Sequence, residues 1–352
     1  MNICTFQKHA WHWLPLALLL IPIAALAQTA AGVGFKTITI HDPVNGGSMP
    51  GYVFYPSAQA KGVTWRGPYE LDASAGTLPV PGAKPLVVIS HGQGGSDLGH
   101  HDLATYLASH GFIVATLEHP KDNFHDSSGV GHLTVLAGRA IQVSATINML
   151  LHDPYWRNLI SADRIGVAGF SMGGYTSLLL VGAVPHFDRL IAYCKRHPGD
   201  TGTCDLITRL AAQSGKTEMD YLDGLQKNFT RWGNTDDPRV KAAFVMAPMS
   251  MVFDQAGLAH INRPVYLYYG QDDPVLLPQY NVLHIAPLIK TLAGIKMIPK
   301  AGHYVFLSPC SPQLAKEAPD ICTDPPGVNR VAEHRQIDAD ALAFFRSTLD
   351  VQ

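Results

Sequence analysis

The sequence predicts an α/β fold in which a mostly parallel central sheet is covered by helices on both faces. Short runs of apolar and β-branched residues alternate with longer segments of helical spacing along most of the 352-residue chain. The strand-like runs are continuously apolar, which is typical of strands buried on both faces of a parallel sheet. The alternation of strands and helices indicates the same layered arrangement. Ligands bind beyond the carboxyl ends of the strands in such sheets, so we expect the functional residues there.

The first two elements are the runs FKTITI and GYVFYP (35–40 and 51–56), which predict an opening hairpin. The buried strands that we expect after this hairpin are 85–90, 112–119, 164–171, 240–248, 264–270 and 295–302. The predicted helices are 101–111, 136–151, 172–183 and 331–349. A glycine, Gly111, gives the first of these helices its stop signal.

Two stretches do not fit this alternation. Residues 183–238 lie between a predicted helix and a predicted strand, and residues 304–330 follow the last strand. We interpret both as insertions at the carboxyl edge of the sheet, where they could roof a pocket. The rest of the chain predicts a single domain over residues 28–352.

Residues 1–27 are expected to be a secretory signal peptide and not part of the fold. Lys8 precedes an apolar run at 13–27, which ends in Ala-Leu-Ala before Gln28, and this is the pattern of a cleavage site. The run is short and interrupted by proline, so an uncleaved anchor is the less favoured alternative. We therefore predict a periplasmic or secreted protein with no stable membrane anchor. The formal net charge of −2 gives no indication of a nucleic-acid partner.

Four cysteines remain after the predicted cleavage, in two local pairs. Cys194 and Cys204 are ten residues apart, and Cys310 and Cys322 are twelve apart. An even number of cysteines in an exported protein indicates disulfides. Three connectivities are possible, and the two local bonds are the simplest. Free thiols or a metal site are the alternative, but the spacings do not match zinc-binding C-x2-C patterns.

The stretch GFSMGGY (169–175) is a candidate nucleophile turn. Ser171 ends a predicted buried strand and begins a predicted helix, with glycines on both sides. G-x-S-x-G at a strand–turn–helix junction is the nucleophile elbow, which lifts the serine hydroxyl above the sheet. The alternative is an ordinary helix N-cap beside a tight turn.

A serine nucleophile needs a base and an acid further along the chain. His303, in PKAGHYVF, follows the last predicted strand, and Asp272 and Asp273 follow the strand before it. The order serine, aspartate, histidine is the one that this kind of fold requires. Either aspartate could be the acid on this reasoning alone.

The turn SHGQGG (90–95) follows the first long strand, and its glycines favour backbone N–H groups aimed at the site. We assign the oxyanion hole to the N–H groups of Gln93 and Met172, and His91 to a structural role in the turn. His100, His101 and Asp102 could suggest a metal site, but we interpret them as a solvated helix start, and no metal is predicted.

The motifs SHGQGG, LEHPKDN, RIGVAGFSMGGYT, GQDDPV, AGHYVF and ICTDPPGVNR occur in this order. As a set they resemble secreted bacterial α/β-hydrolases of the predicted dienelactone hydrolase type, which are similar to platelet-activating factor acetylhydrolases. The resemblance covers nearly all of residues 35–350. It implies esterase activity and a triad of Ser171, Asp273 and His303. With the cysteine pairs and the two insertions above, we predict an α/β-hydrolase fold with two disulfide-braced insertions. Asp273 is favoured because the acid in this family usually lies three residues after the glycine that ends the strand, here Gly270.

Two departures from the family pattern affect the substrate prediction. The family elbow often reads G-H-S-F-G-G, whereas this chain has phenylalanine and methionine, Phe170 and Met172, on either side of the serine. True dienelactone hydrolases use a cysteine nucleophile, so we discount that substrate. We predict hydrolysis of a small-molecule or lipid-like carboxylic ester through an acyl-enzyme, with no cofactor. The alternatives are an amidase or peptidase with the same triad and a binding protein that has lost catalysis.

Overall fold

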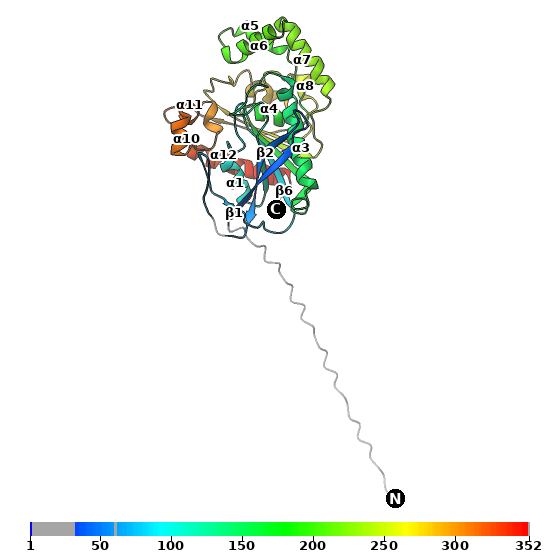
Figure 1. The fold of residues 1–352 in the computed structure, drawn as a ribbon, viewed down its shortest axis with the longest axis vertical. Helices are drawn as coiled ribbons and strands as arrows, with labels where there is room; N and C mark the ends of the chain where they lie inside the picture. The colour runs from blue at the N-terminus through cyan, green and yellow to red at the C-terminus, as the bar shows by residue number, and fades with distance from the viewer. Residues whose placement is uncertain (2–31, 60–61, 351–352) are drawn as a thin grey trace.

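The computed structural model describes Met1 and residues 32–59 and 62–350. The predicted signal peptide and its cleavage site therefore lie outside the described residues, apart from Met1. Figure 1 shows the domain as a sheet with helices on both sides. None of the helices in the described part of the chain has the length and apolarity that a membrane crossing requires.

The central sheet has nine strands in the order β11-β10-β9-β8-β6-β7-β2-β1-β5. The strands from β6 to β11 run parallel, whereas β2 is antiparallel to both β1 and β7. This arrangement confirms the predicted mostly parallel sheet and its opening hairpin. The strand bounds are β1 Gly32–His41, β2 Ser48–Ser57, β5 Ser74–Ala75, β6 Lys84–Ser90, β7 Ile113–Leu117, β8 Ile160–Phe170, β9 Val240–Met246, β10 Val265–Gly270 and β11 Leu292–Ile298.

The strand order reverses at β6, because β7 lies on one side of it and β8 on the other. Loops that leave the carboxyl ends of β6 and β8 therefore diverge, and such a switch point opens a crevice for a ligand. The turn with Gln93 follows β6, and Ser171 follows β8. The topology thus places two of the predicted site segments at the switch point.

Two hydrophobic cores lie on opposite faces of the sheet. Along β6, Leu86 and Val88 pack into one core and Val87 and Ile89 into the other, as the two-residue period of a strand requires. The helices α3 (Gly138–His152) and α4 (Met172–Leu180) cover the first face, and α1 (His101–Ser109) and α12 (Arg330–Thr348) cover the second. These four helices were predicted from their spacing.

Three helices that the sequence analysis did not predict make up most of the first insertion. They are α5 (Arg189–Arg196), α6 (Thr201–Gln213) and α7 (Glu218–Trp232), and they lie together at one end of the molecule (Figure 1). The Cys194–Cys204 disulfide joins α5 to α6. We call α5, α6 and α7 the helical cap. The remaining described elements are β3 Thr64–Arg66, β4 Tyr69–Leu71, α2 Leu133–Leu136, α8 Gln255–Leu258, α9 Val282–Ile285, η1 Ala286–Leu288, η2 His303–Phe306, α10 Pro312–Glu317 and α11 Pro319–Cys322.

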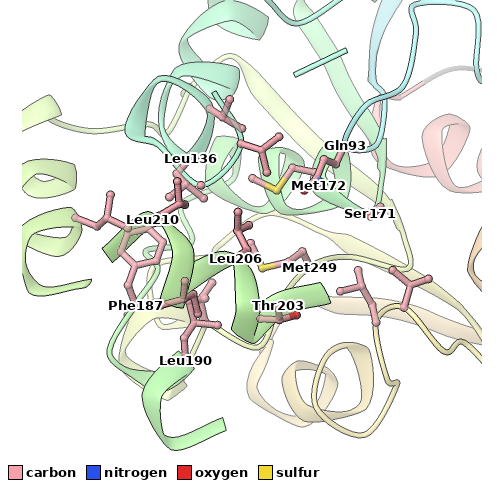
Figure 2. A pocket seen from close by; sticks show the side chains of 18 of the residues that line it. Gln93, Leu136, Ser171, Met172, Phe187, Leu190, Thr203, Leu206, Leu210 and Met249 are labelled. Atoms are coloured by element: carbon pink, nitrogen blue, oxygen red, sulfur yellow. The ribbon is translucent and has the colours of Figure 1, made fainter. Parts of the chain in front are cut away.

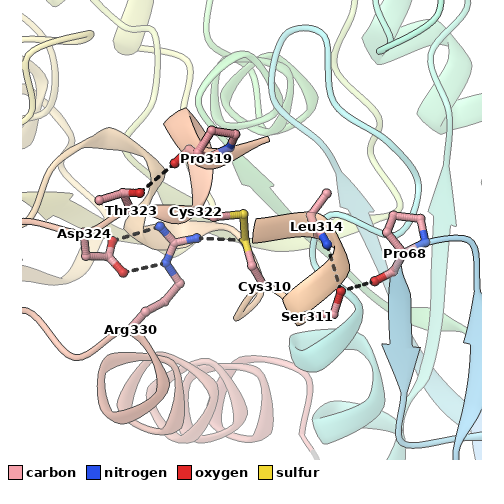
Figure 3. The surroundings of a disulfide bond; sticks show 9 residues. All are labelled: Pro68, Cys310, Ser311, Leu314, Pro319, Cys322, Thr323, Asp324 and Arg330. Atoms are coloured by element: carbon pink, nitrogen blue, oxygen red, sulfur yellow. Dashed lines mark hydrogen bonds and ion pairs between the residues drawn. A yellow bond between two sulfur atoms is a disulfide. The ribbon is translucent and has the colours of Figure 1, made fainter. Parts of the chain in front are cut away.

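The second insertion is held together by the predicted Cys310–Cys322 disulfide (Figure 3). Arg330 pairs with both carboxylate oxygens of Asp324 at 2.9 Å, which fixes the chain beside this disulfide. The Ser311 hydroxyl donates to the carbonyl oxygen of Pro68 and so ties the insertion to the β3–β4 hairpin. Both predicted disulfides are therefore present, and each braces one insertion.

Candidate active site

The backbone at Ser171 forms a strained turn between β8 and α4. Its φ of 56° and ψ of −114° lie in a region that non-glycine residues rarely adopt. Two glycines make the turn possible. A Cβ atom at position 169 would lie 2.1 Å from the carbonyl oxygen of Gly173, and one at position 173 would lie 1.8 Å from that of Ser90. This local geometry is that of the predicted nucleophile elbow.

The three residues of the predicted triad are hydrogen-bonded to one another. His303 Nε2 lies 2.9 Å from Ser171 Oγ, and His303 Nδ1 lies 2.7 Å from Asp273 Oδ2. A carboxylate only accepts, so Nδ1 carries the proton and Nε2 is free to accept from the serine hydroxyl. Asp273 and His303 are both buried. The arrangement provides a hydroxyl, a base and an orienting acid in sequence.

Neighbouring groups hold the acid and the base in place. Asp273 Oδ1 accepts from the backbone N–H groups of Val275 and Leu276 at 2.8 and 2.9 Å. The ring of Phe170 packs against the His303 ring with their centroids 4.7 Å apart. Asp272, by contrast, has an exposed side chain, and its backbone N–H donates to Ala301. Of the two adjacent aspartates, the structure brings Asp273 to the histidine.

The N–H groups of Gln93 and Met172 donate no hydrogen bond within the part of the chain that the structure describes. Both residues line the cavity that contains Ser171. Met172 is the first residue of α4, where an N–H has no partner inside the helix. These two unpaired donors line the same cavity as Ser171, and an oxyanion requires donors of this kind.

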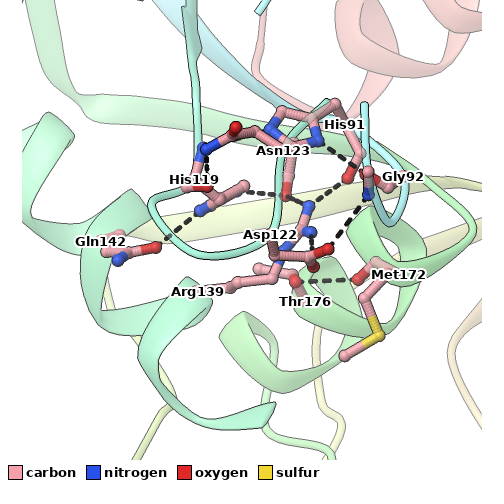
Figure 4. Close-up of polar contacts among 11 residues, drawn as sticks. His91, Gly92, His119, Asp122, Asn123, Arg139, Gln142, Met172 and Thr176 are labelled. Atoms are coloured by element: carbon pink, nitrogen blue, oxygen red, sulfur yellow. Dashed lines mark hydrogen bonds and ion pairs between the residues drawn. The ribbon is translucent and has the colours of Figure 1, made fainter. Parts of the chain in front are cut away.

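A buried network, which the sequence analysis did not predict, holds the loop that carries Gln93 (Figure 4). Asp122 Oδ1 accepts from the N–H of Gly94 at 3.0 Å, and its Oδ2 pairs with Arg139 at 2.5 Å. Arg139 also donates to the carbonyl oxygen of His91. Arg139 and Asp122 have exposed fractions of 1% and 0%. In the sequence, the available signal for this network was Asp122, which lies in the LEHPKDN motif shortly after a strand.

His91 has both ring nitrogens engaged. Its Nδ1 donates to the carbonyl oxygen of Gly92 at 2.6 Å, and its Nε2 accepts from the N–H of His119 at 3.1 Å. Burial, with the nearby charge of Arg139, keeps the pKa of His91 well below its usual value, so the ring is neutral. These contacts agree with the structural role expected for this turn residue.

The expectation of a solvated helix start at His100, His101 and Asp102 is wrong. Both histidines are buried, and Asp102 accepts from Ser308 and from His334 Nδ1. His334 Nε2 lies 2.8 Å from the carbonyl oxygen of Val305, in the short helix that begins at His303. The helix start is buried because α12 and the segment after His303 pack over it, a contact between parts of the chain more than 200 residues apart.

Asp338 lies beside this ion pair. Ligand atoms of Asp102, His334 and Asp338 all lie within 4.8 Å of one another, the one such group with metal-ligand chemistry among the described residues. Both ring nitrogens of His334 are already hydrogen-bonded to Asp102 and Val305, so a metal would have to displace the Nδ1 proton. We therefore treat the group as a buried ion pair with a neighbouring carboxyl group.

A cavity of about 300 Å³ opens at Ser171 and runs under the helical cap (Figure 2). Its wall is mostly apolar and comes from the cap, α2, α4 and the loops that follow β9, β10 and β11. The cap residues that line it are Leu190, Thr203, Leu206, Ile207, Leu210, Tyr221, Leu222 and Leu225, and Phe187, just before the cap, also lines it. The second insertion contributes only Tyr304 to this wall. The first predicted insertion thus roofs the cavity, and the second lies largely beside it.

The strand order and the elbow define the α/β-hydrolase class. The profile of the family described as platelet-activating factor acetylhydrolase, isoform II, matches residues 64–129. This segment contains Gln93 and Asp122 and ends before Ser171. A comparison with curated proteins found no match.

Among solved structures, a ferulic acid esterase from Streptomyces cinnamoneus is similar to this chain, with a TM-score of 0.59 and 21% sequence identity. The similarity covers 94% of this chain and 93% of the esterase. It confirms the predicted α/β-hydrolase fold. The family profile adds that residues 64–129 are similar to the platelet-activating factor acetylhydrolases.

Proposed function

We propose that the protein hydrolyses carboxylic esters through an acyl-enzyme intermediate on Ser171. The observation that carries this proposal is the unbroken chain of hydrogen bonds from Ser171 through His303 to Asp273. It occurs in an α/β-hydrolase fold at the carboxyl edge of the sheet. No cofactor takes part in the proposed chemistry.

In the first half of the reaction, His303 Nε2 takes the hydroxyl proton as Ser171 Oγ attacks the acyl carbonyl carbon. The resulting oxyanion accepts hydrogen bonds from the N–H groups of Gln93 and Met172. Asp273 stabilises the imidazolium that forms. The carbon–oxygen bond to the alcohol then breaks, and His303 gives its proton to the leaving alcohol.

In the second half, a water molecule gives a proton to His303 and attacks the acyl-serine ester. Collapse of the second tetrahedral intermediate breaks the bond to Ser171 and releases the carboxylic acid. The proton on His303 returns to the Ser171 oxygen. An amide substrate would need the same steps, and the family match and the esterase fold support the ester.

The direct test is the Ser171→Ala variant, assayed on p-nitrophenyl esters. We expect loss of nearly all hydrolysis with an unchanged thermal unfolding midpoint, because the hydroxyl is removed without filling or emptying the core. A phosphonate inhibitor should label the wild-type protein once, at Ser171. Labelling of a different residue, or hydrolysis that survives the substitution, would contradict the proposal.

We also propose that residues 1–27 are removed during export and that residues 28–352 form the mature domain, with insertions at about 183–238 and 304–330. The two disulfides support this proposal, because such bonds persist in oxidising compartments. N-terminal sequencing of protein recovered from the periplasm or the culture medium should begin at Gln28. A mature N-terminus at Met1 would contradict it.

A further inference from the structure

We propose that the helical cap forms an acyl-binding chamber for unbranched aliphatic chains of medium length, and that Leu206 and Leu210 limit their length. This inference rests on the proposed ester hydrolysis at Ser171. It goes beyond that function because it names the acyl group that the site accepts and the residues that select it.

The direction of the chamber follows from where the alcohol must leave. The leaving oxygen takes its proton from His303, so the alcohol part must lie on the side of the cavity where His303 and Tyr304 form the wall. The acyl part then extends the other way. Figure 2 shows Leu136, Leu210 and Phe187 across the cavity from Ser171.

Contacts between the cap and the loop before α2 close the far end. The Tyr221 hydroxyl donates to the carbonyl oxygen of Gly131 at 3.1 Å. A Cβ atom on Gly131 would lie 2.3 Å from Leu210 Cδ1 and 3.7 Å from Leu206 Cδ2, so both leucines pack beside the glycine backbone. A closed end sets a maximum length for an acyl chain, and Leu210 lies at that end.

The chemistry of the wall selects an aliphatic chain. Within the described lining, Tyr221 is the only polar side chain at the far end, and its proton is committed to Gly131. The rest of that end consists of valine, leucine, isoleucine and phenylalanine side chains. A hydroxylated aromatic acyl group would find the Tyr221 oxygen as its one side-chain acceptor at this end, and a hydroxyl buried out of its reach would cost binding free energy.

The volume sets the scale of the chain. Water occupies roughly 30 Å³ per molecule in the liquid, so a cavity of about 300 Å³ holds on the order of ten groups of that size. Part of this space is taken by the ester group. We therefore expect the best fit for acyl chains of roughly six to eight carbons, since a methylene group is close to water in size.

The experiment measures kcat/KM of the full chain on p-nitrophenyl esters from acetate to tetradecanoate. Each methylene that enters the chamber should raise kcat/KM about fourfold until the chamber is full, after which kcat/KM should fall. Methyl ferulate should be hydrolysed at least tenfold less efficiently than methyl octanoate. A flat series, or a preference for ferulate, would overturn the chamber proposal.

Two variants test the named residues. Leu210→Trp should shift the optimum to shorter chains, whereas Leu206→Ala should shift it to longer chains. Met219→Trp is the matched control, because Met219 is an exposed residue on the same cap, and its length profile should remain that of the wild type. An unchanged optimum in both leucine variants would overturn their assignment.

Hydrolysis of the acetate ester distinguishes failure of the chamber proposal from failure of the proposed ester hydrolysis. If acetate is hydrolysed and Ser171 is labelled while chain length has no effect, the chamber is wrong and the proposed function stands. If no ester is hydrolysed at all, both are wrong. A variant that fails to fold is recognised by its lost labelling at Ser171, and Leu210→Phe and Leu206→Val then replace the two leucine variants with the same expected directions.

Discussion

At the scale of single residues, burial and backbone hydrogen bonding distinguish Asp273 from Asp272. Asp273 is buried, accepts two backbone N–H bonds and reaches His303, whereas the neighbouring carboxylate is exposed. Adjacent residues in an extended turn point in different directions, so one of the pair can serve the histidine and the other cannot. The position of the acid is therefore a consequence of which side of the turn faces the core.

We predict that Asp273→Asn lowers kcat by a factor on the order of 10⁴, because the amide no longer holds His303 in the productive tautomer. Asp272→Asn is the matched control and should retain activity. The Asp272 side chain is exposed, so this substitution removes no buried contact. Steady-state kinetics of the two variants at equal folded fraction decide the matter, and an inactive Asp272→Asn would reverse the assignment.

The candidate triad could be proposed from the sequence because its three residues are ordered along the chain, and the structure brings them within hydrogen-bonding distance of one another. Ser171, Asp273 and His303 each follow a recognisable strand, so their convergence follows from the sheet. Arg139 gave no such signal, because it lies within a helix pattern and its partners are more than 15 residues away. A buried arginine is indistinguishable from a surface arginine until the packing of that helix is known.

At the scale of elements, the loop after β6 is held in place through α3, a helix on one face of the sheet. Asp122 connects the two, because one of its oxygens accepts from the Gly94 N–H and the other pairs with Arg139 on α3. Burial lowers the pKa of Arg139, and the charge of Asp122 opposes that shift. The ion pair therefore fixes the loop that carries the Gln93 N–H.

We predict that Asp122→Asn destabilises the fold by about 3–5 kcal/mol, because it leaves the buried Arg139 charge uncompensated. It should also lower kcat, since the loop with Gln93 loses its anchor. Urea unfolding and single-substrate kinetics measure the two effects. Asp126→Asn, on the exposed part of the same loop region, should change neither.

A double variant separates stability from catalysis. Asp122→Asn combined with Arg139→Met removes the unpaired charge, so much of the lost stability should return. The kcat should stay low, because the anchor of the Gly94 N–H is still altered. If kcat returned together with stability, the network would serve the fold alone and the loop assignment would be wrong.

The elements of the sheet were predictable, and those of the cap were not. Continuous apolar strands indicate burial on both faces, and their alternation with helices indicates a mostly parallel sheet. The cap helices have apolar residues at helical spacing, for example in DLITRLAAQ, but they belong to no repeating strand–helix unit. Their position over the cavity depends on contacts with the loop before α2, which no local pattern encodes.

At the scale of the whole molecule, one buried ionic group joins the start of α1, the segment after β11 and the middle of α12. Burial raises the pKa of Asp338 to about 8, and the nearby Asp102 carboxylate adds to the shift. Burial is the largest single effect on the pKa of His334, and it acts to lower it. The contacts with Asp102, Asp338 and Val305 together outweigh burial, so the pKa of His334 is raised. The pKa of Asp102 is lowered, because the contacts with His334 outweigh the cost of its burial.

The sign of the pH dependence follows from where the protons are. Between pH about 4 and about 8, Asp338 keeps a proton in the folded protein that an unfolded aspartic acid has already released. Above pH about 6.5, His334 likewise keeps a proton that the unfolded chain loses. Rising pH therefore favours unfolding through both groups. Asp102 acts in the opposite sense and contributes stability that is lost only as the pH falls below about 4.

We predict that the free energy of unfolding decreases from pH 5 to pH 8, with a contribution from Asp338 of up to about 1.4 kcal/mol per pH unit. Asparagine has nearly the shape of protonated aspartic acid but does not titrate. Asp338→Asn should therefore flatten this slope and raise stability at pH 8 relative to the wild type. Urea unfolding at several pH values gives the slope, and the exposed Asp320→Asn provides the control. Equal slopes in the wild type and Asp338→Asn would mean that Asp338 is ionised in the folded protein throughout this range. The polar contact between α1, α12 and the segment after His303 would then depend on the Asp102–His334 pair and not on a protonated Asp338.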